Sequence, residues 1–185
     1  MKNVKEPVVI GNKDVEVVDQ YKYLGVTIQS DLKWNIHTDN QIKKANQRMY
    51  HVRCLVKLRV DNKLITMFYN SIVSSVLMYA ITCWFNSCSE RDRKRIDRFR
   101  KKVSKFVCPE LQCLIENAET VHTSRCIGLV NRIVNDQSHP FHNMFKLLKS
   151  QERFNVIYCK TTRSKNTFVP SAIKICNNNF SKVKL

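Results

Sequence analysis

The sequence predicts an α+β protein that is mostly α, in which a small antiparallel β element is followed by a helical bundle. Only three glycines and four prolines interrupt the 185 residues, so long helices are expected. Strand-like segments rich in valine and tyrosine lie before residue 30, whereas apolar residues after Asn35 recur at three- and four-residue steps. We therefore expect a β element at 1–30, a helical bundle at 31–150 and a partly irregular extension at 151–185.

The β element is predicted as one hairpin plus one strand. Residues 8–10 and 15–18 are apolar and flank the turn formers at 11–14, which is typical of a β-hairpin. A third strand is expected at 21–28, with Gly25 inside it. This glycine either marks a bulge or the close approach of another backbone, or it merely weakens an edge strand.

Two helices are predicted next. The first begins near Asn35, and its apolar face repeats at helical steps through Ile42, Ala45, Met49, Val52 and Val56. Asp61 is placed to cap the second, which is expected to run from Asn62 to about Trp84. This second helix is apolar nearly all round and should lie at the centre of the bundle. Its most apolar part, 72–85, is too short and too polar to span a bilayer, so no membrane partner is expected.

Ser89 is expected to start a third helix, with Asp92 completing a capping box. Its narrow apolar stripe consists of Ile96, Phe99, Val103 and Phe106. Further helix is predicted from beyond Pro109 to about Val134, then a turn and a short helix at 141–148. The C-terminal segments 177–179 and 181–185 are expected to fray.

The charge of the chain indicates a polyanionic partner. With 32 Lys and Arg against 15 Asp and Glu, the formal net charge is +17 and the pI is near 9.7. The basic residues spread over several segments, which favours nucleic acid over a membrane surface. The third helix is the most basic segment, and its cations are Arg91, Arg93, Lys94, Arg95, Arg98, Arg100, Lys101, Lys102 and Lys105. An ordinary solvated helix face is the alternative interpretation.

Phosphate contacts are therefore predicted for a set of cations in the first and third helices: Lys43, Lys44, Arg48, Arg95, Arg98, Lys101, Lys102 and Lys105. Aromatic side chains could also stack on bases, although at helical spacing within apolar stretches they are expected in the core. The aromatic residues considered are Trp34, Tyr50, Phe68, Tyr69 and Trp84.

No cofactor, metal or small-molecule substrate is expected. The eight cysteines and the absence of an apolar signal core at the N-terminus indicate reduced thiols in an intracellular, nuclear or cytoplasmic setting. The ligand types Cys108, Cys113, His122 and Cys126 occur at loose spacing, so core thiols and a surface histidine are expected instead of zinc. His139 and His142 could each bind a metal, but two ligands are too few for a metal site. Cys83 and Cys88 are expected to be buried thiols. Gly-rich phosphate loops and nucleophile elbows are absent from the sequence.

A family resemblance rests on motifs in a fixed order along nearly the whole chain: Tyr21-Lys22-Tyr23-Leu24-Gly25-Val26, Leu32-Lys33-Trp34-Asn35, the basic helix, Ala80-Ile81-Thr82-Cys83-Trp84, Ser138-His139-Pro140 and Phe168-Val169-Pro170-Ser171-Ala172-Ile173. This order resembles the C-terminal region of reverse transcriptases from LINE-type, non-LTR retrotransposons of the jockey-like group. The resemblance implies that Tyr23, Leu24 and Gly25 lie at a palm–thumb junction, near the primer grip. It implies that the following helices form a thumb that holds an RNA/DNA duplex.

The resemblance does not extend to catalysis. Nucleotidyl transfer needs two metal ions held by carboxylates, and the 185 residues contain no Asp-Asp pair. We therefore expect no enzymatic activity from this chain on its own, with the catalytic palm of such a polymerase lying upstream. A helical protein-interaction module, or a pseudogene product without function, is the alternative.

Residues 32–84 are also similar to the helical N-terminal domain of the eighth AlkB homologue. That family implies an iron site built on a His-x-Asp…His motif, together with a methyltransferase domain. His37-Thr38-Asp39 is the only His-x-Asp here, and the strand pattern of a jelly roll is missing. Dioxygenase or methyltransferase chemistry is therefore not expected.

Overall fold

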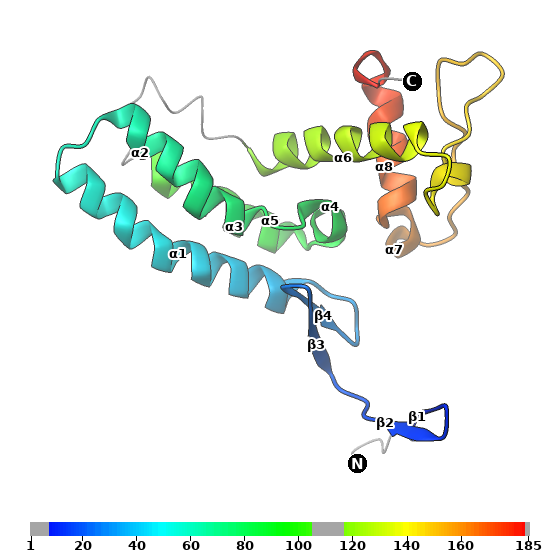
Figure 1. Ribbon diagram of the computed structural model, residues 1–185, viewed down its shortest axis with the longest axis horizontal. Coiled ribbons are helices and arrows are strands. Elements are labelled where there is room, and N and C mark those ends of the chain that lie inside the picture. Colours follow the sequence, from blue (N-terminus) through cyan, green and yellow to red (C-terminus); the bar gives the residue numbers. More distant parts are fainter. Residues whose placement is uncertain (1–7, 105–116, 184–185) are drawn as a thin grey trace.

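The computed structural model describes residues 8–104 and 117–183, and it confirms the α+β, mostly α fold class. Two small β-hairpins precede a set of helices (Figure 1). The first hairpin projects away from the helical body. The helices fall into an N-terminal bundle around α1 to α5 and a C-terminal group around α6 and α8 (Figure 1).

The β element consists of two separate hairpins instead of one hairpin and one strand. In the first, β1 (Val8–Ile10) pairs with β2 (Lys13–Val15) in antiparallel register. In the second, β3 (Gln20–Tyr23) pairs with β4 (Val26–Gln29). The expected single strand at 21–28 is wrong because the chain reverses at Leu24 and Gly25, whose φ angles are 45° and 83°. A two-residue hairpin turn of this kind requires positive φ at both positions.

The first two helices lie side by side (Figure 1). Helix α1 (Asn35–Lys57) buries the predicted face through Ala45, Met49 and Val52. The cap at Asp61 is confirmed, since its carboxylate accepts hydrogen bonds from the backbone N–H groups of Lys63 and Leu64. Helix α2 (Asn62–Phe68) then continues without a break into the π-helical segment η1 (Tyr69–Ser74) and α3 (Ser75–Leu77).

The predicted single helix to Trp84 is wrong, because the chain breaks at Met78–Ala80. Ala80 has a φ of 49°, and the chain restarts as α4 (Ile81–Trp84) followed by the short 3-10 helix η2 (Phe85–Ser87). By length and composition alone, Asn62–Ser87 is apolar enough to cross a membrane. Tyr69, Leu77 and Trp84 of this stretch are buried in the protein core, whereas Leu64 and Met67 are exposed. The stretch is therefore buried on one side, not all round as predicted.

Helix α5 (Glu90–Ser104) begins with the N-cap half of the predicted capping box, while the Asp92 carboxylate accepts from the Ser89 hydroxyl instead of the Ser89 backbone N–H. The Asp92 backbone N–H donates to Ser89 Oγ at 3.2 Å, and the Ser89 hydroxyl donates to Asp92 Oδ2 at 2.7 Å. Ile96, Phe99 and Val103 of the predicted stripe are buried, which confirms them. Phe106 and Lys105 lie outside the described residues.

Helix α6 (Ala118–Asn135) agrees with the predicted helix to about Val134 over the described part. The expected helix at 141–148 is wrong: only the 3-10 turn η4 (His142–Met144) forms there, and Leu147 then bridges to Phe154. The C-terminal segment is more ordered than expected. It forms α7 (Thr162–Lys165), α8 (Phe168–Asn178) and η5 (Phe180–Lys182).

Asn177, expected to fray, instead holds two segments together. Its Oδ1 accepts from the Phe154 backbone N–H at 2.8 Å, and its Nδ2 donates to the Phe154 carbonyl at 3.1 Å. A side-chain amide that satisfies both backbone groups of a buried residue replaces a missing strand partner.

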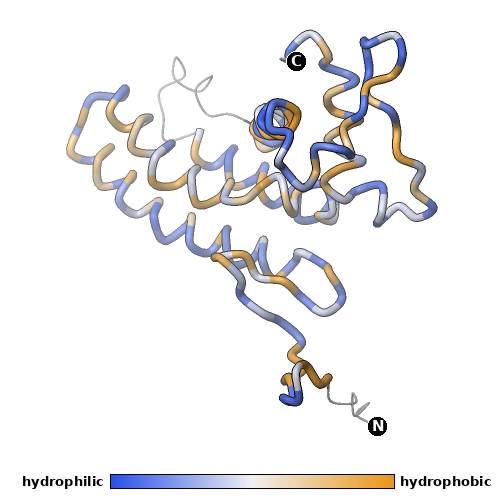
Figure 2. Tube along the Cα trace, turned by 45° about the vertical axis from the view of Figure 1, so that its right-hand side comes forward, coloured by the Kyte–Doolittle hydropathy of each residue, from blue (hydrophilic) through white to orange (hydrophobic). Residues whose placement is uncertain are grey.

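Two hydrophobic clusters form the core. The first joins α1 to α5 and ends at Val121 in α6, and the second begins at Ile127 in α6 and includes Phe154 and Ile173. Helix α6 therefore belongs to both clusters. No residue of the first hairpin is part of either cluster, and Val8 to Ile10 are exposed. Figure 2 shows the hydrophobic colour of this hairpin, which lies apart from the helices.

Candidate nucleic-acid interface

Four cations form a stripe along one side of α5, called here the α5 stripe: Arg91, Arg95, Arg98 and Lys102. They recur at four- and three-residue steps, which places them on one helix face. Three of them, Arg91, Arg98 and Lys102, are exposed and have no carboxylate partner among the residues that the structure describes. These three charges are free to meet an anion.

Arg95 is held within the stripe by two carboxylates. It forms an ion pair with Asp39 of α1 and a second with Asp92 at 3.2 Å. Asp92 is buried and also closes the capping box. Arg95 thus links α5 to α1, and its charge is partly neutralised before any ligand arrives.

The cations predicted in α1 lie on two different flanks. Lys43 is exposed one turn beyond Asp39, so it lies on the flank that faces Arg95. Arg48 is half-buried, and its Nη1 donates to the Ile72 carbonyl of η1 at 2.8 Å. Lys44 precedes Arg48 by one turn and is close enough to His37 to lower the pKa of that ring further. The structure therefore brings Lys43, but not Lys44 or Arg48, beside the α5 stripe.

Tyr50 lies on the same flank of α1 as Lys43, two helical turns further along. Its side chain is 65% exposed, so the expectation of a core position is wrong for this residue. The expectation is confirmed for Tyr69 and Trp84, which are buried, while Trp34 and Phe68 are half-buried. An exposed aromatic ring is a surface on which a base can stack.

A hollow of about 460 Å³ opens where α1 and α5 begin. Lys33, Arg91 and Arg95 line it together with Asp39 and Asp92. Because the carboxylates are already paired with Arg95, the unpaired Arg91 remains as the free charge at this end of the stripe. Sequence reasoning included Arg91 among the basic residues but omitted it from the contact set, although its spacing of four from Arg95 is visible in the sequence.

The second hairpin turn, predicted to resemble a primer grip, is attached to the break in the helical bundle. The Tyr79 hydroxyl donates to the Leu24 carbonyl at 2.8 Å. A Cβ at Gly25 would lie 3.2 Å from Cε1 of Tyr79, so the glycine permits the close approach of an aromatic side chain, not of a backbone. Tyr23 and Leu24 remain exposed at the turn.

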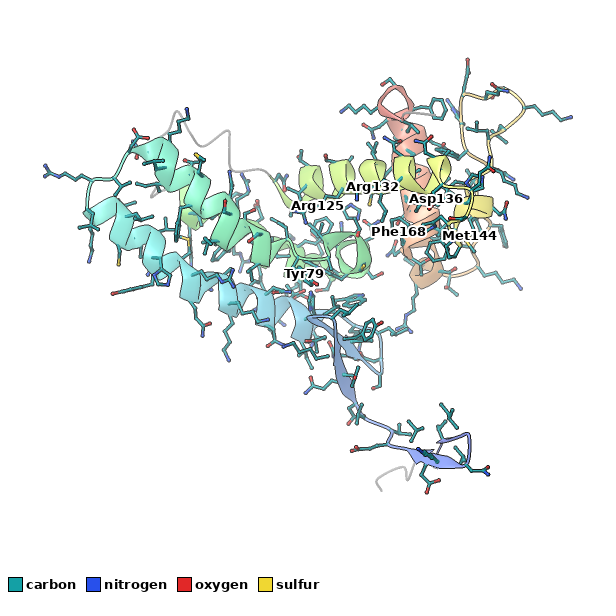
Figure 3. The ribbon with its side chains drawn as sticks, in the orientation of Figure 1. Tyr79, Arg125, Arg132, Asp136, Met144 and Phe168 are labelled. Carbon is teal, nitrogen blue, oxygen red and sulfur yellow. The ribbon has the colours of Figure 1, made fainter. Side chains whose placement is uncertain are left out.

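The same break is fixed from two other sides. The Trp84 indole donates to the Tyr79 carbonyl at 2.8 Å, and Arg125 of α6 donates to the Met78 carbonyl. Figure 3 labels Tyr79, which is part of the break, and Arg125, which belongs to α6. The helix interruption thus positions the hairpin, the bundle and α6 relative to one another.

Histidines and cysteines form no candidate metal centre in the described parts of the chain. His37 is buried; its Nδ1 accepts from the Thr27 backbone N–H at 3.2 Å, and burial lowers its pKa to about 4. Asp39 of the His-x-Asp sequence is committed to Arg95. Both residues of the His-x-Asp sequence therefore make structural contacts in this segment.

His122, expected on the surface, is buried against Phe85 with a ring separation of 5.2 Å. Its Nε2 lies 3.4 Å from Cys126 Sγ, and burial lowers the pKa of His122 to about 4 and raises that of Cys126 to about 12. Cys88 is buried as predicted, whereas Cys83 is exposed. Cys108 and Cys113 lie outside the described residues.

The two C-terminal histidines serve local structure. His139 Nδ1 accepts from the Phe141 backbone N–H at 3.1 Å, and His142 Nδ1 lies 3.1 Å from the Ile133 carbonyl. They stabilise the turn after α6 and do not converge on a shared ligand.

Comparison with known protein families finds one match. The family described as "Alkylated DNA repair protein alkB homolog 8, N-terminal" matches residues 34–75. The match spans α1, α2 and η1 and ends at the start of α3. It agrees with the similarity predicted from residues 32–84, and it covers well under half of the chain. No curated protein and no solved structure matches the chain.

Proposed function

We propose that this chain binds an RNA/DNA duplex through the phosphate backbone, as a thumb-like part of a retrotransposon reverse transcriptase and without catalysis of its own. The observation that carries the proposal is the α5 stripe: three unpaired cations, Arg91, Arg98 and Lys102, spaced along one helix face. Phosphate contacts of this kind supply affinity and position but read no sequence.

Helix α1 extends the same surface. The Asp39–Arg95 pair holds α1 against α5, so that Lys43 and Tyr50 flank the stripe. Lysine charge suits a phosphate and an exposed tyrosine suits a sugar or a base. Lys44 and Arg48 are not part of the proposed contact, because they lie on the flank that faces η1.

The exposed first hairpin also supports a thumb-like role. Its strands of three residues expose apolar side chains, and an isolated two-stranded ribbon is only marginally stable in water. A palm-type sheet to which the hairpin could add its strands would bury them. Tyr23, Leu24 and Gly25 would then lie between such a sheet and the bundle, as the resemblance implies.

A helical domain like the one named in the matched family is the second candidate. It is favoured by the match at residues 34–75 alone. That description is of a DNA repair protein, so this candidate also places the bundle in a protein that acts on nucleic acid. It assigns the chain no dioxygenase activity, because His37 and Asp39 are both engaged in structural contacts.

The test is the salt dependence of binding to an RNA/DNA hybrid duplex. The unmodified protein should lose affinity steeply between 50 and 200 mM salt, with a log–log slope of about −3 or steeper if three or more phosphates are neutralised. Exchanging Arg91, Arg98 and Lys102 together for glutamine should make the slope shallower by about 2 to 3.

A charge-matched control exchanges Lys13, Lys149 and Lys174, three exposed lysines outside α1 and α5, for glutamine. This control should leave the slope almost unchanged. If both triple variants weaken binding equally, net charge alone governs affinity and the α5 stripe is not the interface. A protein partner that persists after nuclease treatment, with no duplex binding at 50 mM salt, would favour an interaction module instead.

A further inference from the structure

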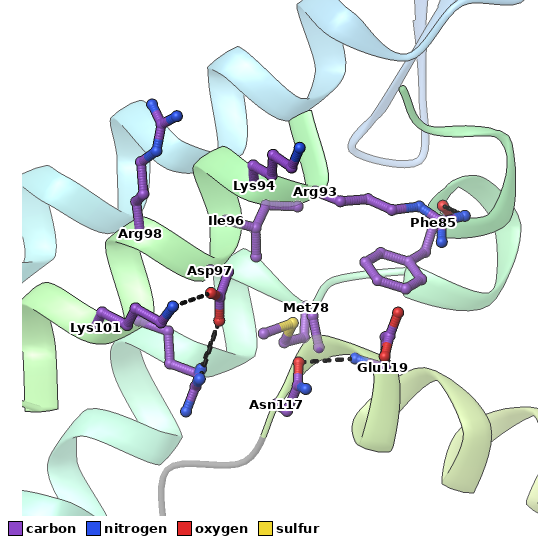
Figure 4. Close-up of a pocket in the computed structure, with 12 residues that line it drawn as sticks. Met78, Phe85, Arg93, Lys94, Ile96, Asp97, Arg98, Lys101, Asn117 and Glu119 are labelled. Atoms are coloured by element: carbon purple, nitrogen blue, oxygen red, sulfur yellow. Dashed lines mark hydrogen bonds and ion pairs between the residues drawn. The ribbon is translucent and has the colours of Figure 1, made fainter. Parts of the chain in front are cut away.

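We propose that a second hollow, between α5 and the start of α6, binds a single nucleotide. The hollow has a volume of about 470 Å³, within the range of roughly 300 to 1,000 Å³ that is typical of small-ligand sites. Figure 4 shows it bounded by α5 on one side and by Asn117 and Glu119 on the other. All of its lining residues belong to the described part of the chain.

The floor of the hollow is apolar. Met78, Phe85, Ile96 and Ala118 contribute to it, and each is buried. A thioether and an aromatic ring are side chains against which a planar base packs well.

Arg93 gives this floor a fixed planar group. Its guanidinium lies 4.8 Å from the centre of the Phe85 ring and donates to the carbonyls of Phe85 and Asn86, both at 3.0 Å. A guanidinium held in one plane is a surface on which unpaired bases stack. Both of these hydrogen bonds come from Nη2, which fixes the plane of the guanidinium, and we assign Arg93 a stacking role.

The rim of the hollow is cationic. Arg98 and Lys101 both line the hollow; Arg98 has no carboxylate partner among the described residues and its guanidinium points away from Asp97, whereas Lys101 points toward Asp97 (Figure 4). Asp97 is the carboxylate nearest to them, but Lys101 and Arg100 bind it at 3.0 Å each. The hydrogen bond from Lys101, and that from Arg100, lower the pKa of Asp97, so the carboxylate stays ionised and paired. Asp97, Arg100 and Lys101 together therefore carry a net charge of one positive unit.

The combination of floor and rim identifies the class of ligand. A phosphate alone would not use the apolar floor, and an apolar ligand would not use the cations. A nucleotide carries both a planar base and a phosphate. Glu119, the other carboxylate at the rim, is exposed and opposes the phosphate, so it limits affinity.

The nucleotide can be free, or it can be the unpaired end of a bound strand. The second source rests on the proposed function, because Arg98 belongs both to this hollow and to the α5 stripe. A strand held by the stripe would then place its terminal base within reach of the floor.

The experiment is calorimetric titration with AMP, adenosine and inorganic phosphate. AMP should bind at least about tenfold more tightly than adenosine or phosphate, since only AMP engages floor and rim together. Lys101→Gln should weaken AMP binding about tenfold, as expected for loss of one charge-assisted contact. Glu119→Gln should strengthen it about two- to threefold. Lys174→Gln is the matched control: Lys174 is an exposed lysine of α8 that neither lines the hollow nor belongs to the α5 stripe, and its loss should leave AMP binding unchanged.

The source of the nucleotide is separated by comparing a blunt hybrid duplex with one that carries a one-nucleotide overhang. A preference for the overhang that Lys101→Gln abolishes assigns the hollow to a strand end, and AMP binding without that preference assigns it to a free nucleotide. The proposal is overturned if phosphate binds as well as AMP, or if Lys101→Gln and Lys174→Gln change AMP binding by the same factor. Blunt-duplex binding that depends on Lys102 would leave the proposed function intact in either case.

Discussion

Arginine side chains of this protein serve different purposes because of what lies beside them. Arg48 and Arg93 donate to backbone carbonyls, and Arg95 pairs with two carboxylates. Arg91 and Arg98 of α5 have no carboxylate partner in the described parts of the chain, so both are available to a phosphate. Arginine content alone therefore overstates the size of the interface.

Arg48 shows the physical reason for a structural role. A π-helical segment shifts the register of backbone hydrogen bonds, so a carbonyl can be left without its usual partner. The guanidinium of Arg48 reaches the Ile72 carbonyl of η1 and satisfies it. A hydrogen bond from a charged group to a half-buried acceptor contributes roughly 1.5 to 3 kcal/mol.

The buried histidines make stability depend on pH. Burial lowers the pKa of His37 and of His122 to about 4, below the unfolded value of about 6.5. The folded state thus binds fewer protons, so stability is greatest above pH 6.5 and declines as the pH falls toward 4. We expect a loss on the order of 2 kcal/mol per buried histidine over this window, measured by urea unfolding.

His37→Gln should reduce this loss, because glutamine does not titrate and its carbonyl can still accept from Thr27. His51→Gln is the control, since His51 is exposed and its removal should leave the pH dependence as in the unmodified protein. An unchanged pH dependence in His37→Gln would contradict the assigned cause.

At the scale of elements, the second hairpin and the break after α3 are built as one unit. The turn at Gly25 needs positive φ, and it lies against the Tyr79 ring. The Tyr79 hydroxyl in turn holds the Leu24 carbonyl. The position of the hairpin therefore depends on the helix break, which places the Tyr79 side chain against the turn.

Gly25→Ala should destabilise the protein by about 1 to 2 kcal/mol, because an L side chain is strained at φ 83° and its Cβ would crowd Tyr79. Gly128→Ala is the matched control. Gly128 is an exposed position inside α6 with nothing within 4 Å of an added Cβ, so this exchange should stabilise by about 0.5 to 1 kcal/mol. Thermal unfolding measures both, and equal effects of one sign would refute the argument.

At the scale of the whole molecule, two hydrophobic clusters share one helix. Val121 of α6 belongs to the first cluster and Ile127, less than two turns later, to the second. A helix that is continuous through both cannot unfold in one cluster without losing support in the other. The protein should therefore unfold in a single cooperative transition.

Ile173→Ala tests this coupling. Ile173 is fully buried in the second cluster, and its truncation should cost about 2 to 5 kcal/mol. Both tryptophans, Trp34 and Trp84, pack in the first cluster, so their fluorescence reports on the part that is not mutated. The fluorescence midpoint should fall together with the far-UV circular dichroism midpoint. A fluorescence transition that stays in place while circular dichroism splits into two steps would show that the clusters unfold independently.

The sequence by itself determined the local features of this protein. Asp61 and the Ser89–Asp92 box mark helix starts because capping acts between neighbours, and the periodic apolar residues of α1 and α5 face the core because helical spacing is fixed. The excess of cations, and their concentration in α5, are also visible in the sequence.

Only the tertiary structure decided which cations have partners, because pairing joins residues far apart in the chain. Arg95 forms an ion pair with Asp39, and Arg48 donates a hydrogen bond to the Ile72 carbonyl. The break at Ala80 and the placement of Gly25 against Tyr79 also depend on contacts between distant segments. The conformational preferences of neighbouring residues do not predict such contacts. Packing between distant segments therefore decided which cations of α5 remain unpaired within the described residues, namely Arg91, Arg98 and Lys102.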